Sequence, residues 1–247
     1  GRMLEPSGKR YFLDKTPAYA LVLPFLEKLY PNAVFVAITR HPFAIFSSYA
    51  KSFFDDDWAA AHAFNPVIER YVPALASFIR SPPRRFHHVR YEELVSDPEA
   101  QLRAICAAAD LDYVPSMLDY GQKQVEGTGL GDPVGVAQHT RASTGSIAKW
   151  AKQVAGNQPR IDLLNRILAK LQDEDLATLG FQRDTVWAPL AEVDEAAAAT
   201  AQRASLKWDR HHIERRALLH LRRNIHNNAL GKALGRVRFY CDVLLRE

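Results

Sequence analysis

The sequence predicts an α/β fold with a parallel sheet, and three observations support this. Residues 33–39 form a continuous apolar run rich in β-branched residues, which is typical of a strand buried on both faces. A second strand-like run, at residues 85–91, follows a stretch with helical periodicity, so strands and helices alternate along the chain. Hydrophobic residues make up 47% and charged residues 24% of the 247 residues, a balance that indicates a folded chain rather than a disordered one, and the length suits one medium domain or one domain with an appendage.

The first predicted elements lie before the apolar run. Residues 11–17 predict a short strand that ends at Pro17. Residues 18–29 carry apolar side chains at helical spacing, and Pro31 closes this predicted helix.

Prolines punctuate the segment between the two predicted strands. Pro42 opens a helix that runs to about Ser52, since proline in the first turn loses no hydrogen bond. A longer helical stretch follows and ends near Ile79, and we expect breaks near Pro66 and Pro73.

The second half of the predicted domain is mostly helical. Residues 97–99 (Asp-Pro-Glu) are a helix start. Residues 113–143 show little periodicity, and loops of that length in compact domains are usually functional. Helices are predicted again for residues 146–154 and 160–179.

The charge distribution divides the chain into a main domain, residues 1–182, and a basic helical extension, residues 183–247. Residues 201–247 contain 11 Lys and Arg against four Asp and Glu, a net charge of +7, whereas the other 200 residues contain 21 against 24. Apolar residues at steps of three and four over residues 203–245 predict amphipathic helices. These could pack on the main domain, form a homodimer or dock a partner protein. Nucleic-acid binding is not expected, because few aromatic side chains lie among the arginines.

Several classes of protein are excluded. No stretch approaches the 18 apolar residues of a membrane span. Cys106 and Cys241 are too few for a disulfide framework or a zinc cluster, and they indicate a reducing compartment, so we expect a cytoplasmic protein. The histidine pairs 87–88 and 211–212 have no Cys or carboxylate at ligand spacing, so no metal site is expected.

The most informative position is Arg40, at the end of the apolar run. Ligands bind at the carboxyl ends of strands in open α/β sheets. Ser48 follows eight positions later, about two turns into the next helix, and a guanidinium and a hydroxyl so placed can converge on one phosphate. The spacing alone fits equally well a solvated strand-end arginine and an ordinary helix serine.

Three blocks give the sequence a family resemblance. They lie at residues 14–20 (Asp-Lys-Thr-Pro-Ala-Tyr-Ala), 39–48 (Thr-Arg-His-Pro, ending in serine) and 90–99 (Arg-Tyr-Glu-Glu-Leu-Val, then Asp-Pro-Glu). In order and spacing they resemble PAPS-dependent sulfotransferases over residues 9–182. The sequence is most similar to bacterial members, including the sulfotransferase domains of olefin-forming polyketide synthases, which share the first block and the Gly-Asp-Pro and histidine of residues 131–139.

This resemblance implies a fold and a reaction. The fold is a P-loop-like three-layer parallel sheet with helices on both faces. The reaction transfers a sulfuryl group from 3′-phosphoadenosine-5′-phosphosulfate (PAPS) to an acceptor hydroxyl, leaves PAP and needs no metal. The acceptor implied is a β-hydroxyacyl chain on a carrier protein or another small metabolite. A P-loop NTPase is disfavoured, because the Gly-x-x-x-x-Gly-Lys-Ser/Thr motif is absent.

The resemblance also implies the nucleotide-binding residues. It puts Arg40 and Ser48 on the 3′-phosphate of PAPS and Tyr91 against the nucleotide near the adenine. Arg141 lies in a segment similar to the late loop that closes over the 3′-phosphate, although the usual Arg-Lys-Gly of that loop is replaced here.

Two catalytic residues follow from the same resemblance. Lys15 matches a position proposed to favour the charge that builds on the bridging oxygen during transfer, as in phosphoryl transfer. The acceptor hydroxyl must also lose its proton to a base. The histidine that sits two residues after the lysine in well-known cytosolic members is replaced by Pro17, so His139 is the candidate base.

One family feature is missing from the sequence. The loop that cradles the 5′-phosphosulfate is expected several tens of residues before Lys15, where this sequence has 14 residues. Residues 6–10 lie too close to Lys15 and have no strand before them. The simplest explanation is that the segment with this loop precedes the given sequence. If the chain instead begins at Gly1, we expect no turnover of PAPS, and a degenerate, non-catalytic scaffold is the alternative function.

Overall fold

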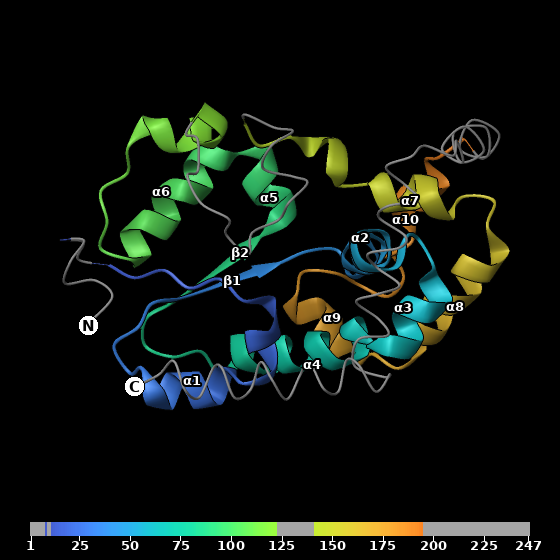
Figure 1. The fold of residues 1–247 in the computed structure, drawn as a ribbon, viewed down its shortest axis with the longest axis horizontal. Coiled ribbons are helices and arrows are strands. Elements are labelled where there is room, and N and C mark those ends of the chain that lie inside the picture. Colours follow the sequence, from blue (N-terminus) through green and yellow to red (C-terminus); the bar gives the residue numbers. More distant parts are fainter. Residues whose placement is uncertain (1–7, 9–10, 123–140, 195–247) are drawn as a thin grey trace, which may run out of the picture. The chain divides into compact units, whose positions relative to one another are not determined.

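The computed structural model describes residue 8, residues 11–122 and residues 141–194, and the chain divides into two compact units. Unit 1 consists of Gly1–Arg40, Ile68–Thr144 and Lys170–Gln182, and unit 2 of His41–Val67, Gly145–Ala169 and Arg183–Glu247. The elements wholly or mainly in unit 1 (Figure 1) are η2 (Pro17–Leu21), α1 (Leu23–Leu29), β1 (Phe35–Thr39), α4 (Val67–Arg80), β2 (Phe86–Arg90), α5 (Tyr91–Ser96), α6 (Pro98–Ala108), η3 (Pro115–Gln122) and α9 (Asp173–Thr178). Those wholly or mainly in unit 2 are α2 (Pro42–Phe54), α3 (Trp58–Phe64), η4 (Thr144–Ser146), α7 (Lys149–Val154), α8 (Gln158–Ala169) and α10 (Ala188–Ala191).

The two strands of unit 1 pair in parallel. Strand β1 coincides with the run predicted at residues 33–39 and β2 with the run predicted at residues 85–91, so both strands are confirmed. The register sets Thr39 opposite Arg90, and the two strands therefore end side by side. The described part of the chain is a mixed helix and strand structure with a parallel pair, which confirms the α/β prediction at this level.

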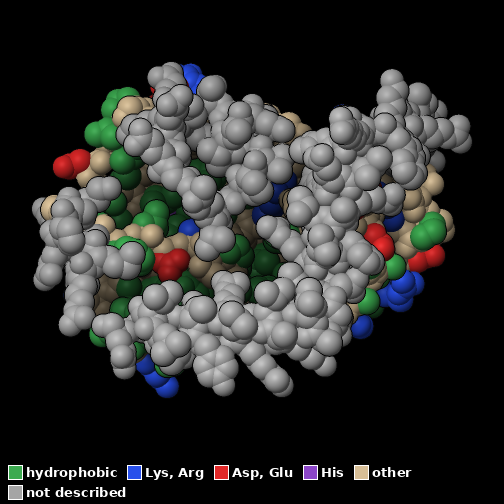
Figure 2. Space-filling view, viewed as in Figure 1, with side chains coloured by type: hydrophobic (Ala, Val, Ile, Leu, Met, Phe, Trp, Pro, Cys, Tyr) green, Lys and Arg blue, Asp and Glu red, His purple; other side chains and the backbone are tan. Residues whose placement is uncertain are grey.

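Strand β1 is covered on one face and open on the other. The rings of Phe35 and Phe86 contact Phe78 of α4, at centroid distances of 5.5 and 5.8 Å. On the opposite face of β1, the exposed fractions of Val36 and Ile38 are 39% and 53%. The predicted burial on both faces is therefore wrong, because alternate residues of a strand point to opposite faces and the packed helix covers only one of them. Figure 2 shows, more generally, that hydrophobic side chains are visible at the surface of the described part of the molecule.

Proline and aspartate set several helix ends. Pro42 is the first residue of α2, as predicted. Asp97 caps α6 by accepting a hydrogen bond from the backbone N–H of Ala100 at 3.1 Å. The break predicted at Pro66 lies between α3 and α4, but Pro73 lies inside α4. The break predicted there is wrong, because the buried face of α4 outweighs the hydrogen bond that proline removes.

The strand predicted for residues 11–17 is absent. Asp14 accepts hydrogen bonds from the hydroxyl groups of Thr16 at 3.1 Å and Tyr19 at 2.7 Å, and such local bonds favour a turn over an extended backbone. The bond to Asp14 raises the pKa of the Tyr19 hydroxyl, because the ionised phenol could not donate it. The helix predicted for residues 18–29 is present as two pieces, η2 and α1.

The predicted extension falls largely outside the described part of the chain. Residues 195–247 are not described, so the division at residue 182 and the amphipathic helices of residues 203–245 stay predictions. Among the helices of the described residues, none has the length and apolar character needed to cross a bilayer.

A part-buried hydrogen bond joins the end of β1 to the middle of β2. Thr39 is 1% exposed, and its Oγ1 lies 2.8 Å from Nε2 of His88 on β2. The pKa of His88 lies below its usual 6.5, mainly because the imidazole is partly buried. The positive charge of Arg90 and the neighbouring His87 also lower this pKa, and the negative charge of Glu93 partly offsets them. The neutral imidazole is therefore the form that the folded chain favours.

We expect the free energy of unfolding to fall as the pH drops below about 6.5. Between the folded pKa of His88 and 6.5 the unfolded chain binds more protons than the folded chain. The stability contributed by neutral His88 is therefore complete above pH 6.5 and is lost as the pH falls toward the folded pKa. Urea unfolding between about pH 7.5 and about pH 5 measures this. Because His88→Gln cannot titrate at this position, its pH dependence should be weaker, and an equal dependence in both proteins would contradict the prediction.

Candidate functional site

Arg40 and Tyr91 meet at the carboxyl ends of the paired strands. Arg40 directly follows β1, and Tyr91 directly follows β2 as the first residue of α5. The pairing of Thr39 with Arg90 places these next residues beside each other. The Cζ atom of Arg40 lies 4.3 Å from the centroid of the Tyr91 ring, a cation–π contact worth about 1 kcal/mol. The sequence predicted both residues in one site but not this contact, which orients the guanidinium.

This arrangement suits an anion. A guanidinium stacked by its flat face keeps its N–H donors in the plane of the group, at its edge. Both side chains are half-buried, where a hydrogen bond to a charged group is stronger than in water. The carboxyl ends of parallel strands are also the usual ligand-binding edge of such sheets. The residues present therefore fit a phosphate at Arg40.

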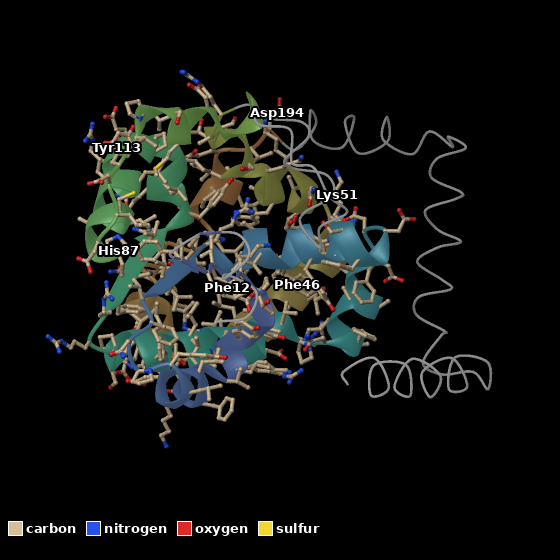
Figure 3. All side chains as sticks on the ribbon, turned by 60° about the vertical axis from the view of Figure 1, so that its left-hand side comes forward. Phe12, Phe46, Lys51, His87, Tyr113 and Asp194 are labelled. Atoms are coloured by element: carbon tan, nitrogen blue, oxygen red, sulfur yellow. The ribbon has the colours of Figure 1, made fainter. Side chains whose placement is uncertain are left out.

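Ser48 lies on α2 in unit 2, the helix that also carries Phe46 (Figure 3). Its side chain is exposed, whereas Ser47 is 4% exposed and donates a hydrogen bond to Oε1 of Gln153. Successive helix positions differ by about 100°, so the inward direction of Ser47 leaves Ser48 at the surface. Arg40 belongs to unit 1, and the predicted convergence of Arg40 and Ser48 on one phosphate stays a prediction.

A polar network fixes the helices of unit 2 around Gln153. Arg160 of α8 donates to the backbone carbonyl of Gln153 at 3.0 Å and to the carboxylate of Asp56 at 2.7 Å. Asp56 also accepts a hydrogen bond from the indole of Trp58 at 2.8 Å, and Cζ of Arg160 lies 4.9 Å from the Trp58 ring centroid. Sequence reasoning missed this network, because Arg160 and Asp56 are 104 positions apart. Because Gln153 also accepts the hydrogen bond of Ser47, this network supports α2, the helix on which Ser48 lies.

His41, the centre of the Arg-His-Pro block, belongs to the core of unit 2. It is 6% exposed and stacks on Trp150, with the ring centroids 4.8 Å apart and the planes at 18°. Its Nε2 lies 3.0 Å from the carbonyl oxygen of Val186, and since a carbonyl only accepts, Nε2 carries the proton. Phe43 packs against both rings. The histidine of this block therefore has a structural role, which the sequence did not reveal.

Lys15 is exposed in the irregular segment before η2. Asp14 and Thr16, its neighbours in the chain, are hydrogen bonded to each other. Lys15 has no ion pair or hydrogen bond with the described residues. Its amine is accessible, and its catalytic role stays a prediction.

Arg141 is exposed and forms an ion pair with Asp119. The hydrogen bond to Asp119, and then the charge of that carboxylate, raise the pKa of the guanidinium. A phosphate that binds Arg141 would therefore compete with a carboxylate. Its predicted role at the 3′-phosphate stays a prediction.

The remaining predicted chemistry concerns His139, the cysteines and metals. His139 lies outside the described residues. Cys106 is a buried free thiol that contacts the sulfur of Met117 at 3.8 Å. Within residues 11–122 and 141–194, no three His, Cys, Asp or Glu side chains are grouped so that they could hold a metal ion.

Comparison with known proteins gives a sulfotransferase family and two curated relatives. The model of the Sulfotransferase family matches residues 3–115. Nodulation protein NoeE of Sinorhizobium fredii is 28% identical over 148 residues, which are 50% of this chain and 34% of NoeE. Omega-hydroxy-beta-dihydromenaquinone-9 sulfotransferase Stf3 of Mycobacterium bovis is 26% identical over 121 residues, 43% of this chain and 31% of Stf3. The chain spans about a third of the length of these relatives.

Two solved sulfotransferase domains resemble this chain. The domain from the curacin biosynthetic pathway has a TM-score of 0.51 and 21% identity, covering 68% of this chain and 65% of that domain, which shows a shared fold. The domain from the Synechococcus PCC 7002 olefin synthase has a TM-score of 0.48 and 27% identity, with coverages of 60% and 54%. The model of the Sulfotransferase family matches residues 3–115, which contain the three sequence blocks, so the resemblance predicted from those blocks is confirmed.

Proposed function

We propose that this chain binds PAPS and takes part in the transfer of its sulfuryl group to an acceptor hydroxyl. The observation that carries the proposal is the guanidinium of Arg40 held on the ring of Tyr91 at the ends of two paired strands. The match of the Sulfotransferase family model to residues 3–115 supports the type of reaction. Both residues lie inside that matched region.

We assign the nucleotide contacts as follows. Arg40 binds the 3′-phosphate through the N–H donors at the edge of its guanidinium, together with the hydroxyl of Ser48. Tyr91 carries Arg40 on one face of its ring, so it meets the nucleotide through another part of its surface. Arg141 adds a second guanidinium to the 3′-phosphate when it exchanges Asp119 for that anion.

The nucleotide supplies the sulfuryl group when it is bound. In the transfer, the acceptor oxygen forms a bond to sulfur while the bond from sulfur to the bridging phosphate oxygen breaks. Lys15 stabilises the negative charge that develops on the bridging oxygen. His139 takes the proton that the acceptor hydroxyl loses. The products are PAP and a sulfate ester.

The acceptor class that we propose is a hydroxyl on a small metabolite, and a β-hydroxyacyl chain on a carrier protein is one such substrate. The sequence resemblance to polyketide-synthase sulfotransferases suggested the carrier-bound substrate. The name of Stf3, a sulfotransferase of a hydroxylated menaquinone, is consistent with a hydroxyl acceptor more generally.

The wider architecture is part of the same proposal. We propose a three-layer P-loop-like sheet within residues 1–182, to which the two described strands belong. Residues 183–247 form the basic extension, and its helices at residues 203–245 mediate a homodimer or partner docking. We place the protein in the cytoplasm.

Arg40→Ala should weaken the binding of PAP by about 10- to 100-fold, because a charge-assisted contact to the 3′-phosphate is lost. Arg40→Lys keeps the positive charge but loses the planar stacking on Tyr91, so its affinity should be intermediate. Titration calorimetry of the intact protein with PAP, and with ATP for comparison, measures these affinities.

Arg84→Ala is the matched control for this measurement, because Arg84 is an exposed arginine of the segment before β2. It should change the affinity for PAP by less than about twofold. If Arg40→Ala folds normally and binds PAP as the wild type does, the assignment fails. If the wild type binds no PAP, the result favours the alternative function, a non-catalytic scaffold.

Lys15→Met should lower the rate of sulfuryl transfer about 100-fold, because one stabilising charge at the bridging oxygen is removed. The affinity for PAP should stay within about threefold, since the lysine acts mainly on the transition state. Single-turnover kinetics of the intact protein separate these two quantities. Lys28→Met in α1 removes another exposed lysine and serves as control; equal rates in the two variants would refute the role of Lys15.

A further inference from the structure

Gly180 ends helix α9 in a backbone conformation that glycine favours. Its φ is +85°. Its N–H donates to the carbonyl of Ala177 at 2.9 Å, and the N–H of Phe181 donates to the carbonyl of Leu176 at 2.9 Å. These two bonds are those of a Schellman motif, in which a left-handed residue follows the helix. The helix end explains the backbone of Gly180, but not what lies against it.

The side chain of Arg90 fills the space beside Gly180. A Cβ atom at Gly180 would lie 2.7 Å from Nε and 2.8 Å from Cζ of Arg90, distances that real Cβ atoms essentially never show. On the guanidinium, Cζ lies 5.0 Å from the ring centroid of Phe181, and Nη1 lies 3.5 Å from Oε1 of Glu93. The Nε atom is buried without a hydrogen-bond partner among the described residues. Packing, more than hydrogen bonding, therefore sets the position of this side chain.

Arg90 is adjacent in the chain to the proposed nucleotide site. It is the last residue of β2 and pairs with Thr39, and the next residues of the two strands are Tyr91 and Arg40. Two arginine–aromatic contacts thus lie at the same edge of the sheet, Arg90 with Phe181 and Arg40 with Tyr91. Because Arg90 and Tyr91 share a peptide bond, a displacement that carries the backbone of Arg90 with it also changes the direction in which the Tyr91 ring leaves the chain.

We propose that Gly180 is a positioning residue for the nucleotide site. The absence of a side chain at Gly180 lets Arg90 lie flat on Phe181, which fixes Tyr91 and through it the guanidinium of Arg40. The link to the nucleotide rests on the proposed function, whereas the link from Gly180 to Arg40 concerns the geometry of this chain alone. No contact between Gly180 and the nucleotide is needed.

The chain offers a matched control for a substitution at Gly180. Gly156 also has a positive φ, +69°, but a Cβ atom there would meet nothing within 4 Å. Gly156→Ala and Gly180→Ala therefore introduce the same backbone strain, and only Gly180→Ala also collides with Arg90. Arg90→Ala tests the same contact without any strain at a glycine. It replaces Gly180→Ala as the test variant if Gly180→Ala does not fold.

The first readout does not involve a nucleotide. In the wild type we expect the Tyr91 ring to shift the NMR resonance of the Arg40 Nε–H group, because Cζ of Arg40 lies 4.3 Å from the ring centroid. This resonance should move toward its free-arginine position in Gly180→Ala and in Arg90→Ala, and should stay in place in Gly156→Ala. An unchanged Arg40 resonance in a folded Gly180→Ala or Arg90→Ala variant overturns the proposal.

The second readout is the affinity for PAP. Gly180→Ala and Arg90→Ala should each lose about tenfold, roughly the worth of a cation–π contact in a partly desolvated site, and Gly156→Ala should lose less than about twofold. The double variant should lose no more than either single variant, because both act through one contact. Additive losses overturn the proposal. A wild type that binds no PAP refutes the proposed function, and the Arg40 resonance then still decides whether Gly180 positions Arg40.

Discussion

The parallel pairing of β1 with β2 is the constraint on which the candidate site depends. It places Thr39 opposite Arg90, and from that register it follows that Arg40 and Tyr91 leave the sheet side by side. The hydrogen bond between Thr39, at the end of β1, and His88, in the middle of β2, supports this register. A slip of one residue would reverse the face to which every side chain of a strand points, so the contact between Arg40 and Tyr91 exists only in this alignment.

The sequence predicted those parts of the fold whose signals are local. The strand ending at Thr39 is a continuous apolar run, and the first residue of α2 is a proline, so both could be located from the sequence. The segment of residues 11–17 has strand-like composition, but it is irregular, and Asp14 forms hydrogen bonds with Thr16 and Tyr19 close by in the chain. Pro73 should have broken α4, and the burial of the helix on its neighbours outweighs it. In the first failure local side-chain bonds decided the structure, and in the second a tertiary contact did.

The same division applies to the candidate site. The position of Arg40 could be read from its place after an apolar strand, because a strand end is a local feature, and Tyr91 was assigned through the family resemblance. Their mutual contact could not, since it depends on pairing over a separation of about 50 residues. The contact between Arg90 and Gly180 joins residues that are even farther apart in the sequence. The one sequence signal that could have suggested it is a glycine directly after a helix, which predicts a positive φ but names no neighbour.

The two arginines assigned to the 3′-phosphate differ in what holds them. Arg141 is paired with the carboxylate of Asp119, so an incoming phosphate replaces one anion by another and the net gain is small. Arg40 contacts the face of an aromatic ring, and the N–H donors of its guanidinium lie at the edge of the group, away from that contact. The contact with Tyr91 is therefore compatible with a phosphate at Arg40, whereas the contact with Asp119 competes with a phosphate at Arg141.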